Sequence, residues 1–425
     1  MKIGVDVLPD TLNPAKISTY ASKSVMTLFF EPIYSDVENR GLCWVNRVND
    51  YLWKIELKEK YWSNGERIST ANIINTFVYY QKNNLSLSKE LDVIENWQQY
   101  RKGAREFTDV GIIQENNNIF YIKTNCTCNL YNLFSNVEFT PLYLINNEFL
   151  QIGSGIFIPE ENKEYRYNSN KFHQASIEES LELILVEDPD SVLFYSKNNI
   201  IDTTPTTLYK RDILDKLPGR IVKKSSSIHV SLLLNSNRSR EERNKIKDII
   251  ENTEFENITS TFGYFFEEKN KKVNKRNSDK ECVIELTFSA TNYYPNYKNI
   301  KKISPLAHIK EIPLYVPPSD YVNDNSDVVY MLFRLNIESE YTLLLSYISY
   351  IDEDYIDDYI ELLNLHNIFQ LSEEEKKRIN RFLEKHSNLI PIGNVEHQYK
   401  NNPENNLRLC IDANDCYYLD YGDEE

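Results

Sequence analysis

Residues 62–77 read Trp-Ser-Asn-Gly-Glu-Arg-Ile-Ser-Thr-Ala-Asn-Ile-Ile-Asn-Thr-Phe. This stretch predicts a strand end, a turn at Gly65 and an amphipathic helix over residues 70–81. Gly65 supplies the conformational freedom of a turn, and the side-chain oxygen of Ser69 can cap the free N–H groups of a helix. Apolar residues then recur at helical spacing through Phe77, so one face of the helix should be buried.

The same stretch resembles, without a gap, the W-S-D-G-x-x-(hydrophobic)-T-A-x-D-V-x-x-S-(aromatic) signature of family 5 bacterial solute-binding proteins. These are the peptide and nickel receptors of ABC importers. Weaker matches to the family lie at Leu12–Ala15, Phe30–Tyr34, Gly153–Gly155, residues 196–202 and Leu389–Ile392. The resemblance implies an α/β, two-lobed type II periplasmic-binding-protein-like fold, in which the lobes close on a ligand about a hinge.

The resemblance also implies how the chain is divided. Lobe I would combine residues 1–215 with residues 396–425, and residues 31–150 would form an extra subdomain within it. Lobe II would span residues 216–395. A length of 425 residues independently favours two lobes, because a single hydrophobic core rarely grows to that size.

Local patterns predict strands that alternate with helices. Alternation or continuous apolar runs indicate strands at residues 2–6, 51–58, 110–114, 119–123, 283–288 and 328–333. Charged helices are expected at residues 238–251 and 373–385. This alternation favours an α/β architecture with mostly parallel sheets.

Composition and charge exclude several classes of protein. The chain is 41% hydrophobic and 12% aromatic, which is typical of a globular protein and not of a disordered one. Its net charge of −16 argues against nucleic-acid binding and against attachment to an anionic membrane. We expect a monomer.

The location of the protein depends on its native start. No run of about 18 apolar residues occurs, so the sequence predicts no membrane-spanning helix. Residues 1–7 lead directly into strand-like alternation and do not resemble a secretory signal. We expect a cytoplasmic protein if Met1 is the native start, and a periplasmic or cell-surface protein if a signal segment has been removed.

The sequence contains no motif of a known catalytic or cofactor site. P-loop, dinucleotide-binding, H-E-x-x-H and G-x-S-x-G patterns are all missing from the sequence, and its six His are scattered. Cys126 and Cys128 form a C-x-C pair without a second pair at zinc spacing. Cys410 and Cys416 could bridge a turn in an oxidising compartment, and the sequence does not say whether they do. We expect a non-enzyme that holds no cofactor and no metal.

Candidate ligand-binding residues follow from the resemblance and from two hinge segments. In peptide receptors an acidic residue of lobe II holds the ligand amine, and Asn336 and Ser339 fall where the family has Asp. Glu338 could still pair with a cation, and Arg334 could bind an anion in bidentate fashion. The hinge candidates are Asp202, Thr203 and Thr204 with Pro205, and Ser225–His229. The Thr and Ser hydroxyls of these segments could donate hydrogen bonds to a ligand, or they could serve only to complete turns. A lone histidine such as His229 more often has a structural role than a ligand-binding one.

Three functions remain open. The leading hypothesis is a binding protein that captures a small polar ligand, a peptide or peptide-like molecule, and docks on an ABC permease. The second is a cytoplasmic sensor of a phosphorylated sugar or another anionic metabolite. The third is an accessory protein that sequesters a peptide product.

Overall fold

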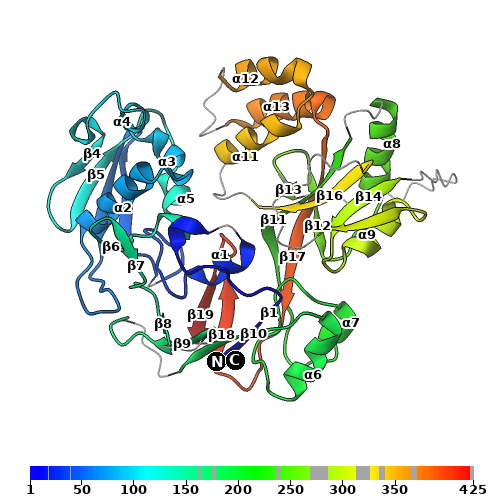
Figure 1. Ribbon diagram of the computed structural model, residues 1–425, viewed down its shortest axis with the longest axis horizontal. Coiled ribbons are helices and arrows are strands. Elements are labelled where there is room, and N and C mark those ends of the chain that lie inside the picture. Colours follow the sequence, from blue (N-terminus) through cyan, green and yellow to red (C-terminus); the bar gives the residue numbers. More distant parts are fainter. Residues whose placement is uncertain are drawn as a thin grey trace.

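The computed structural model describes residues 1–17, 19–38, 40–160, 164–174, 179–235, 240–268, 286–312, 326–334, 340–364 and 371–421. The chain forms two lobes that meet at the base of the view in Figure 1. Strand β1 (Lys2–Val5) and the C-terminal hairpin of β18 (Leu407–Ile411) and β19 (Tyr417–Tyr421) both lie at this base. The two ends of the described chain therefore belong to the same lobe, lobe I.

Lobe I is built on a four-stranded sheet whose strand order is β1-β10-β9-β8. Its other strands are β10 (Leu181–Leu185), β9 (Arg166–Ser169) and β8 (Phe157–Pro159). Helix α1 (Tyr20–Met26) starts at the cap Thr19 and packs in one core with this sheet and the C-terminal hairpin. Two short helices, α6 (Val192–Lys197) and α7 (Arg211–Leu214), follow β10.

The opening stretch lies in a separate subdomain of lobe I. The predicted helix is confirmed as α2 (Thr70–Lys82), and the Ser69 backbone N–H donates to the Asn72 side chain over 2.8 Å in a capping box. Gly65 has a φ of +89°, which an L side chain rarely adopts.

The rest of this subdomain packs on α2. Its sheet runs β2-β3-β5-β4, and three of the four Trp of the chain lie in its core. The strands of this sheet are β2 (Cys43–Asn49), β3 (Leu52–Leu57), β4 (Ile112–Gln114) and β5 (Ile119–Lys123). The subdomain also contains a separate two-stranded sheet of β6 (Tyr143–Ile145) and β7 (Glu148–Leu150). Its other helices are α3 (Leu87–Glu90), α4 (Trp97–Arg101) and α5 (Leu130–Phe134).

Lobe II is built on a seven-stranded sheet of order β13-β12-β17-β11-β16-β14-β15. Its strands are β11 (Val222–Leu234), β12 (Ile258–Phe262), β13 (Glu267–Glu268), β14 (Thr287–Thr291), β15 (His308–Ile312), β16 (Val328–Phe333) and β17 (Leu389–Tyr399). Its helices are α8 (Arg240–Glu251), α9 (Asn296–Ile303), α11 (Glu340–Ser346), α12 (Ile356–Asn364) and α13 (Glu373–His386).

The apolar strand β16 confirms the expectation of a strand buried on both faces. Val329 and Met331 pack in a core with α11, α12 and α13, whereas Val328 and Tyr330 pack in another core with α8 and α9. Successive side chains of a strand point to opposite faces, so each face of the sheet has its own helical layer. Of the other predicted apolar strand, at residues 283–288, residues 283–285 lie outside the described residues and the last two belong to β14.

The prediction of mostly parallel sheets is wrong. Among the described strands, only β1 with β10, β14 with β15 and β14 with β16 pair in parallel. Many of the antiparallel neighbours are consecutive in the chain and joined by turns too short to hold a crossover helix, as in the hairpins β2–β3, β4–β5 and β18–β19. Such connections permit only antiparallel pairing.

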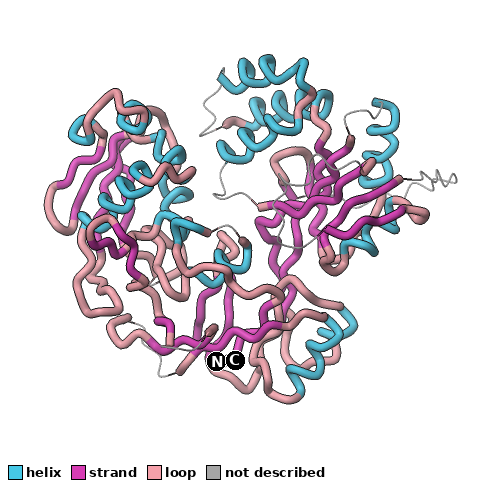
Figure 2. The backbone as a smooth tube through the Cα atoms, in the orientation of Figure 1, coloured by secondary structure: helices cyan, strands magenta, loops and turns pink. Residues whose placement is uncertain are grey.

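Two long strands connect the lobes. Figure 2 shows β11 and β17 running from the base into the sheet of lobe II. They pair antiparallel, with a break in register between Ser225 and His229. This bulge falls on the predicted hinge segment, and bulges bend a strand locally. The predicted lobe boundaries at residues 216 and 395 remain predictions.

Candidate functional site

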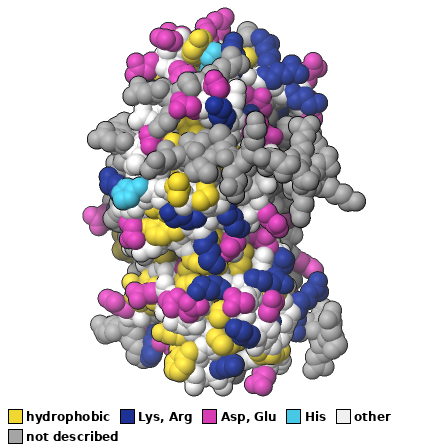
Figure 3. Space-filling model, turned by 90° about the vertical axis from the view of Figure 1, so that its right-hand side faces the viewer, with side chains coloured by type: hydrophobic (Ala, Val, Ile, Leu, Met, Phe, Trp, Pro, Cys, Tyr) yellow, Lys and Arg dark blue, Asp and Glu magenta, His cyan; other side chains and the backbone are white. Residues whose placement is uncertain are grey.

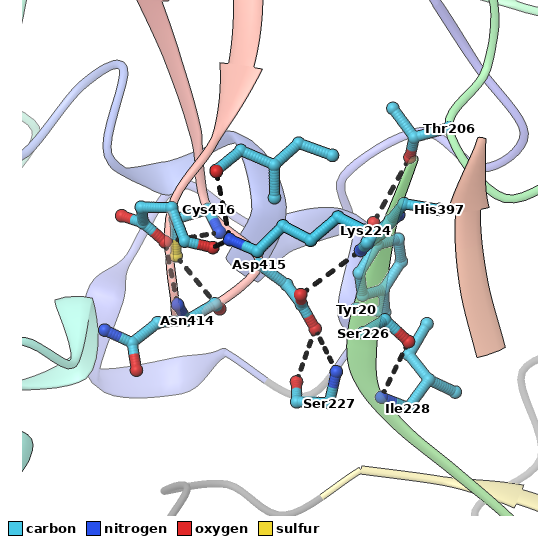
Figure 4. Close-up of polar contacts among 12 residues, drawn as sticks. Tyr20, Thr206, Lys224, Ser226, Ser227, Ile228, His397, Asn414, Asp415 and Cys416 are labelled. Atoms are coloured by element: carbon cyan, nitrogen blue, oxygen red, sulfur yellow. Dashed lines mark hydrogen bonds and ion pairs between the residues drawn. The ribbon is translucent and has the colours of Figure 1, made fainter. Parts of the chain in front are cut away.

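The turn between β18 and β19 carries the central carboxylate of the candidate site. Asp412 accepts hydrogen bonds from the backbone N–H groups of Asn414 and Cys416, both over 2.9 Å, which close the turn. Asp415 then has a φ of +61°, a left-handed conformation that Asp tolerates better than most residues. This backbone directs the Asp415 carboxylate away from the hairpin and toward the two long strands (Figure 4).

Asp415 bonds to both long strands at once. Its Oδ2 accepts from the backbone N–H and the hydroxyl of Ser227 on β11, each over 2.5 Å. Its Oδ1 lies 3.2 Å from Nε2 of His397 on β17. Burial raises the pKa of Asp415, but the His397 hydrogen bond and the charges of His397 and Arg334 outweigh it and hold this pKa below its usual range. An ionised carboxylate therefore ties the bulge of β11 and the strand β17 to a turn of lobe I.

Arg334 adds a contact from lobe II. It follows β16, and its Nε donates to the Ser227 hydroxyl over 2.9 Å while its Nη2 donates to the Asn414 carbonyl over 3.2 Å. From β11, the Lys224 ammonium also donates to the carbonyls of Ile411, over 3.0 Å, and Asp412. The hairpin turn is thus held by cations from both the long strand and lobe II.

Hydroxyl groups line the neighbouring part of the site. The hydroxyls of Thr206 and Tyr417 lie 2.9 Å apart, and that of Tyr20 lies 3.4 Å from Thr206. The Tyr20 ring lies 5.9 Å from the His397 ring, centroid to centroid. Burial raises the pKa of both tyrosines, so both are neutral and can donate as well as accept.

The structure places the predicted site residues in different environments. Asp202 accepts from the Lys2 backbone N–H over 2.6 Å, and Thr203 and Thr204 bond to residues 400–401 over 2.9 and 3.0 Å. These bonds join β1 to the end of β17, so the three side chains hold lobe I together. Their predicted role in ligand binding stays a prediction.

The lobe II candidates are only partly described. Of these, Arg334 contacts lobe I as above, and Asn336 and Glu338 lie outside the described residues. His229 is buried in lobe II, with Nδ1 2.9 Å from the side-chain oxygen of Asn394 and its ring stacked on Phe266 at 4.1 Å. The structure brings Arg334 together with Ser227 of the hinge segment. The bonds described for Asp202 lie within lobe I, and His229 bonds to Asn394 in lobe II.

The sequence pointed to Ser227 but not to Asp415 or His397. The Asp412–Cys416 run reads as a polar turn, and nothing local shows what its carboxylates face. His397 has no metal-ligand spacing to other histidines. Both residues find their partners through contacts between distant parts of the chain.

Comparisons with known proteins agree with this architecture. No protein-family model and no curated protein matches the sequence. Solved structures match over nearly the whole length. The murein tripeptide binding protein MppA of Escherichia coli is 12% identical, with a TM-score of 0.71 over 96% of this chain and 94% of that one.

Two further neighbours are peptide complexes. Haemophilus influenzae OppA in complex with RPPGFSPFR is 13% identical, with a TM-score of 0.69 over 96% of this chain and 95% of that one. Listeria monocytogenes OppA bound to peptide is 14% identical, with a TM-score of 0.69 over 98% and 96%. This chain has the fold of the oligopeptide-binding proteins. It is therefore a two-lobed type II fold, as expected. Its likeness to the unliganded open form of MppA, with a TM-score of 0.62, is lower than its likeness to the first MppA structure, with a TM-score of 0.71.

Other predictions concern metals, thiols and the membrane. Within the described ranges, no group of three or more His, Cys, Asp or Glu could hold a metal ion. Cys410 and Cys416 are free thiols, because Cys410 lies on the outer face of β18 and Cys416 is fully buried on the inner side. Cys126 and Cys128 lie in a loop and not on a strand. The described helices include none with the length and apolar character needed to span a membrane.

Proposed function

We propose that this protein binds a peptide or peptide-like molecule between its two lobes and releases it when the lobes move apart about β11 and β17. The observation that carries the proposal is the full-length likeness to structures of peptide-binding proteins, two of them solved with peptide. The contacts of Arg334 and Ser227 with the hairpin turn support it, because they join lobe II to lobe I beside the two long strands.

The boundaries that we propose follow the same architecture. Lobe I would comprise residues 1–215 and 396–425, with residues 31–150 as its subdomain, and lobe II residues 216–395. The sheets of each lobe are consistent with this division, since β1 and β18 lie in one lobe and β12 to β16 in the other.

The proposal extends to partners. An ABC permease would receive the ligand, and the protein would act as a monomer without catalysis. Figure 3 shows acidic and basic side chains intermingled over the side of the molecule that lobe II forms above α6 and α7 of lobe I, and this side lacks the single-sign field that binds nucleic acid. Fractionation of cells into cytosol, membrane and secreted material would test whether the protein works beside a permease.

Thermal unfolding in the presence of candidate ligands tests the binding function. A library of di- to pentapeptides should raise the melting temperature in a concentration-dependent way, because a ligand that binds only the folded state stabilises it. Phosphorylated sugars serve as the comparison class. A shift with phosphosugars and none with any peptide would refute peptide binding and favour the sensor.

A pair of variants locates the binding event. Arg334→Ala removes the hydrogen bond to the Asn414 carbonyl that joins the lobes, together with the bond to Ser227 within lobe II, and should weaken peptide binding by about tenfold, since about 1.4 kcal/mol corresponds to a factor of ten. Arg408→Ala is the matched control, because Arg408 is exposed on the outer face of β18. Equal affinities for both variants would place the ligand away from the contact between the lobes.

A further inference from the structure

A hydrogen bond joins the two lobes far from the base of the molecule. The Thr342 hydroxyl on α11 of lobe II donates to Oε1 of Glu90, at the end of α3 in the subdomain of lobe I, over 2.9 Å. Figure 1 places α3 and α11 on facing sides of the two lobes, away from the base at which β11 and β17 enter lobe II. A rotation about those strands moves the most distant groups furthest, so this contact breaks when the lobes move apart.

The Glu90 carboxylate lies in this contact without a countercharge. Within the described part of the chain it forms no ion pair. Asp92, the charged group of its own lobe that acts on it, pairs with Arg101 over 2.6 Å. On the side of lobe II, α11 carries Glu340, which pairs with Lys376 of α13 over 2.5 Å. The cations of both neighbourhoods are thus engaged by other carboxylates.

Removal from water makes the ionisation of Glu90 costly. Burial raises the pKa of its carboxyl to about 7; the Thr342 hydrogen bond opposes this rise, and the charge of Asp92 adds to it. The neutral carboxyl can accept the Thr342 hydrogen bond through its carbonyl oxygen, as the carboxylate can. Near neutral pH the group therefore exchanges between a neutral form that suits the contact and an ionised form that is poorly solvated there.

Proton binding by Glu90 links the position of the lobes to pH. With the lobes together the carboxyl holds its proton up to about pH 7, whereas a glutamate in water loses it near its usual pKa of 4.5. The advantage that the proton gives to the joined lobes is therefore complete below pH 4.5. It falls as the pH rises to 7 and changes no further above that pH.

We propose that the contact between Glu90 and Thr342 is a proton-controlled latch, in which neutral Glu90 lets the two lobes stay together and ionised Glu90 favours their separation. The inference rests on the proposed function and adds its regulation. The protein would hold its ligand more tightly in mild acid and release it more readily at neutral and alkaline pH.

Calorimetric titration at several pH values tests the latch. The probe is the library peptide that binds the wild-type protein most tightly. From pH 5.5 to pH 8 its affinity should fall roughly 10- to 30-fold more for the wild type than for Glu90→Gln, given the two pKa values of Glu90. The amide is neutral throughout and can still accept the Thr342 hydrogen bond, and any titration of the peptide is common to both proteins.

The same titrations measure the proton itself. At pH 6, binding should take up about one proton more in the wild type than in Glu90→Gln. The number of protons follows from the binding heats in two buffers that have different ionisation enthalpies. This readout separates proton linkage from a general effect of pH on the stability of the protein.

Two further variants separate charge from structure. Thr342→Lys places an ammonium group opposite Glu90, so it should abolish the fall in affinity or reverse it. Glu106→Gln is the matched control, because Glu106 is exposed on the same subdomain, and it should behave as the wild type does.

An equal pH dependence of affinity in the wild type and in Glu90→Gln would overturn the latch while peptide binding stands. If no peptide binds the wild-type protein at any pH, the proposed function fails, and small-angle X-ray scattering of the protein alone decides the latch. The radius of gyration of the wild type should then be larger at pH 8 than at pH 5.5, and that of Glu90→Gln should be the same at both. Equal values for the wild type would overturn the latch as well.

Discussion

Replacing Asp415 by Asn should loosen the connection between the hairpin turn of lobe I and the two long strands. The carboxylate accepts hydrogen bonds from the backbone N–H and hydroxyl of Ser227 and lies 3.2 Å from His397. Asn keeps the shape and tolerates the left-handed backbone at this position, so the change removes charge without adding strain.

The expected magnitude follows from these contacts. A hydrogen bond to a charged group contributes about 1.5–3 kcal/mol, against about 0.5–1.5 kcal/mol for a neutral one. The loss of about 1 kcal/mol in each of the three contacts of Asp415 gives a total of about 3 kcal/mol. If local opening controls exchange, the Ser227 amide proton should exchange roughly 150-fold faster in the variant.

Hydrogen exchange read by NMR or mass spectrometry over residues 222–234 is the appropriate assay. Global unfolding of a two-lobed protein need not be two-state, whereas amide exchange reports this strand directly. Asp420→Asn is the control, since Asp420 lies exposed on the same hairpin. Unchanged protection of Ser227 in Asp415→Asn would refute the reasoning that this carboxylate holds the strand.

The effect should also depend on pH with a defined sign. The pKa of Asp415 is lower in the folded protein than its usual value of 3.8. Its stabilisation is therefore fully present above that value and is lost as the pH falls through the folded pKa. The difference between wild type and variant should be the same at pH 7 and pH 5, and it should shrink only in stronger acid.

Two other sites give independent tests. Burial and the nearby charge of Asp92 raise the pKa of Glu90 to about 7, although the hydrogen bond that Thr342 of lobe II donates to Glu90 over 2.9 Å lowers it. The wild-type protein should therefore lose stability relative to Glu90→Gln as the pH rises from 4.5 to 7. The variant should melt at a higher temperature than the wild type at pH 8 and at the same temperature at pH 4. A difference in melting temperature that does not change with pH would contradict this reasoning. Lys23 and Glu138 form a buried pair over 2.9 Å with exposures of 1% and 3%. Lys23→Met should cost about 3–5 kcal/mol in urea unfolding, and adding Glu138→Leu should restore most of it; a double variant as unstable as the single one would show that charge is not the cause.

Local sequence was a good guide to individual elements. The helix at residues 70–82 could be predicted from its cap and its apolar spacing, and β16 from its continuous apolar run, because these signals lie within one turn or one strand. The strand pair at residues 112–114 and 119–123 was equally predictable from the turn between the two strands. Whether neighbouring strands pair in parallel or antiparallel could not be predicted, because the alternation of helices and strands does not say which strands become neighbours.

The candidate site was harder to predict for the same reason. The resemblance made Arg334 a candidate for binding an anionic group of the ligand, whereas its partners in the structure lie on β11 and in the hairpin turn of lobe I. Asp415 and Ser227, whose side chains are hydrogen-bonded, are 188 residues apart in the chain.

The residues of the opening stretch encode their own turn, cap and helix through interactions between near neighbours, and they also carry the resemblance to a binding fold. The position of an ionised carboxylate at the hinge depends on how the two lobes pack. Burial and the charges of distant groups set the protonation of such residues, and neither is written in the adjacent sequence.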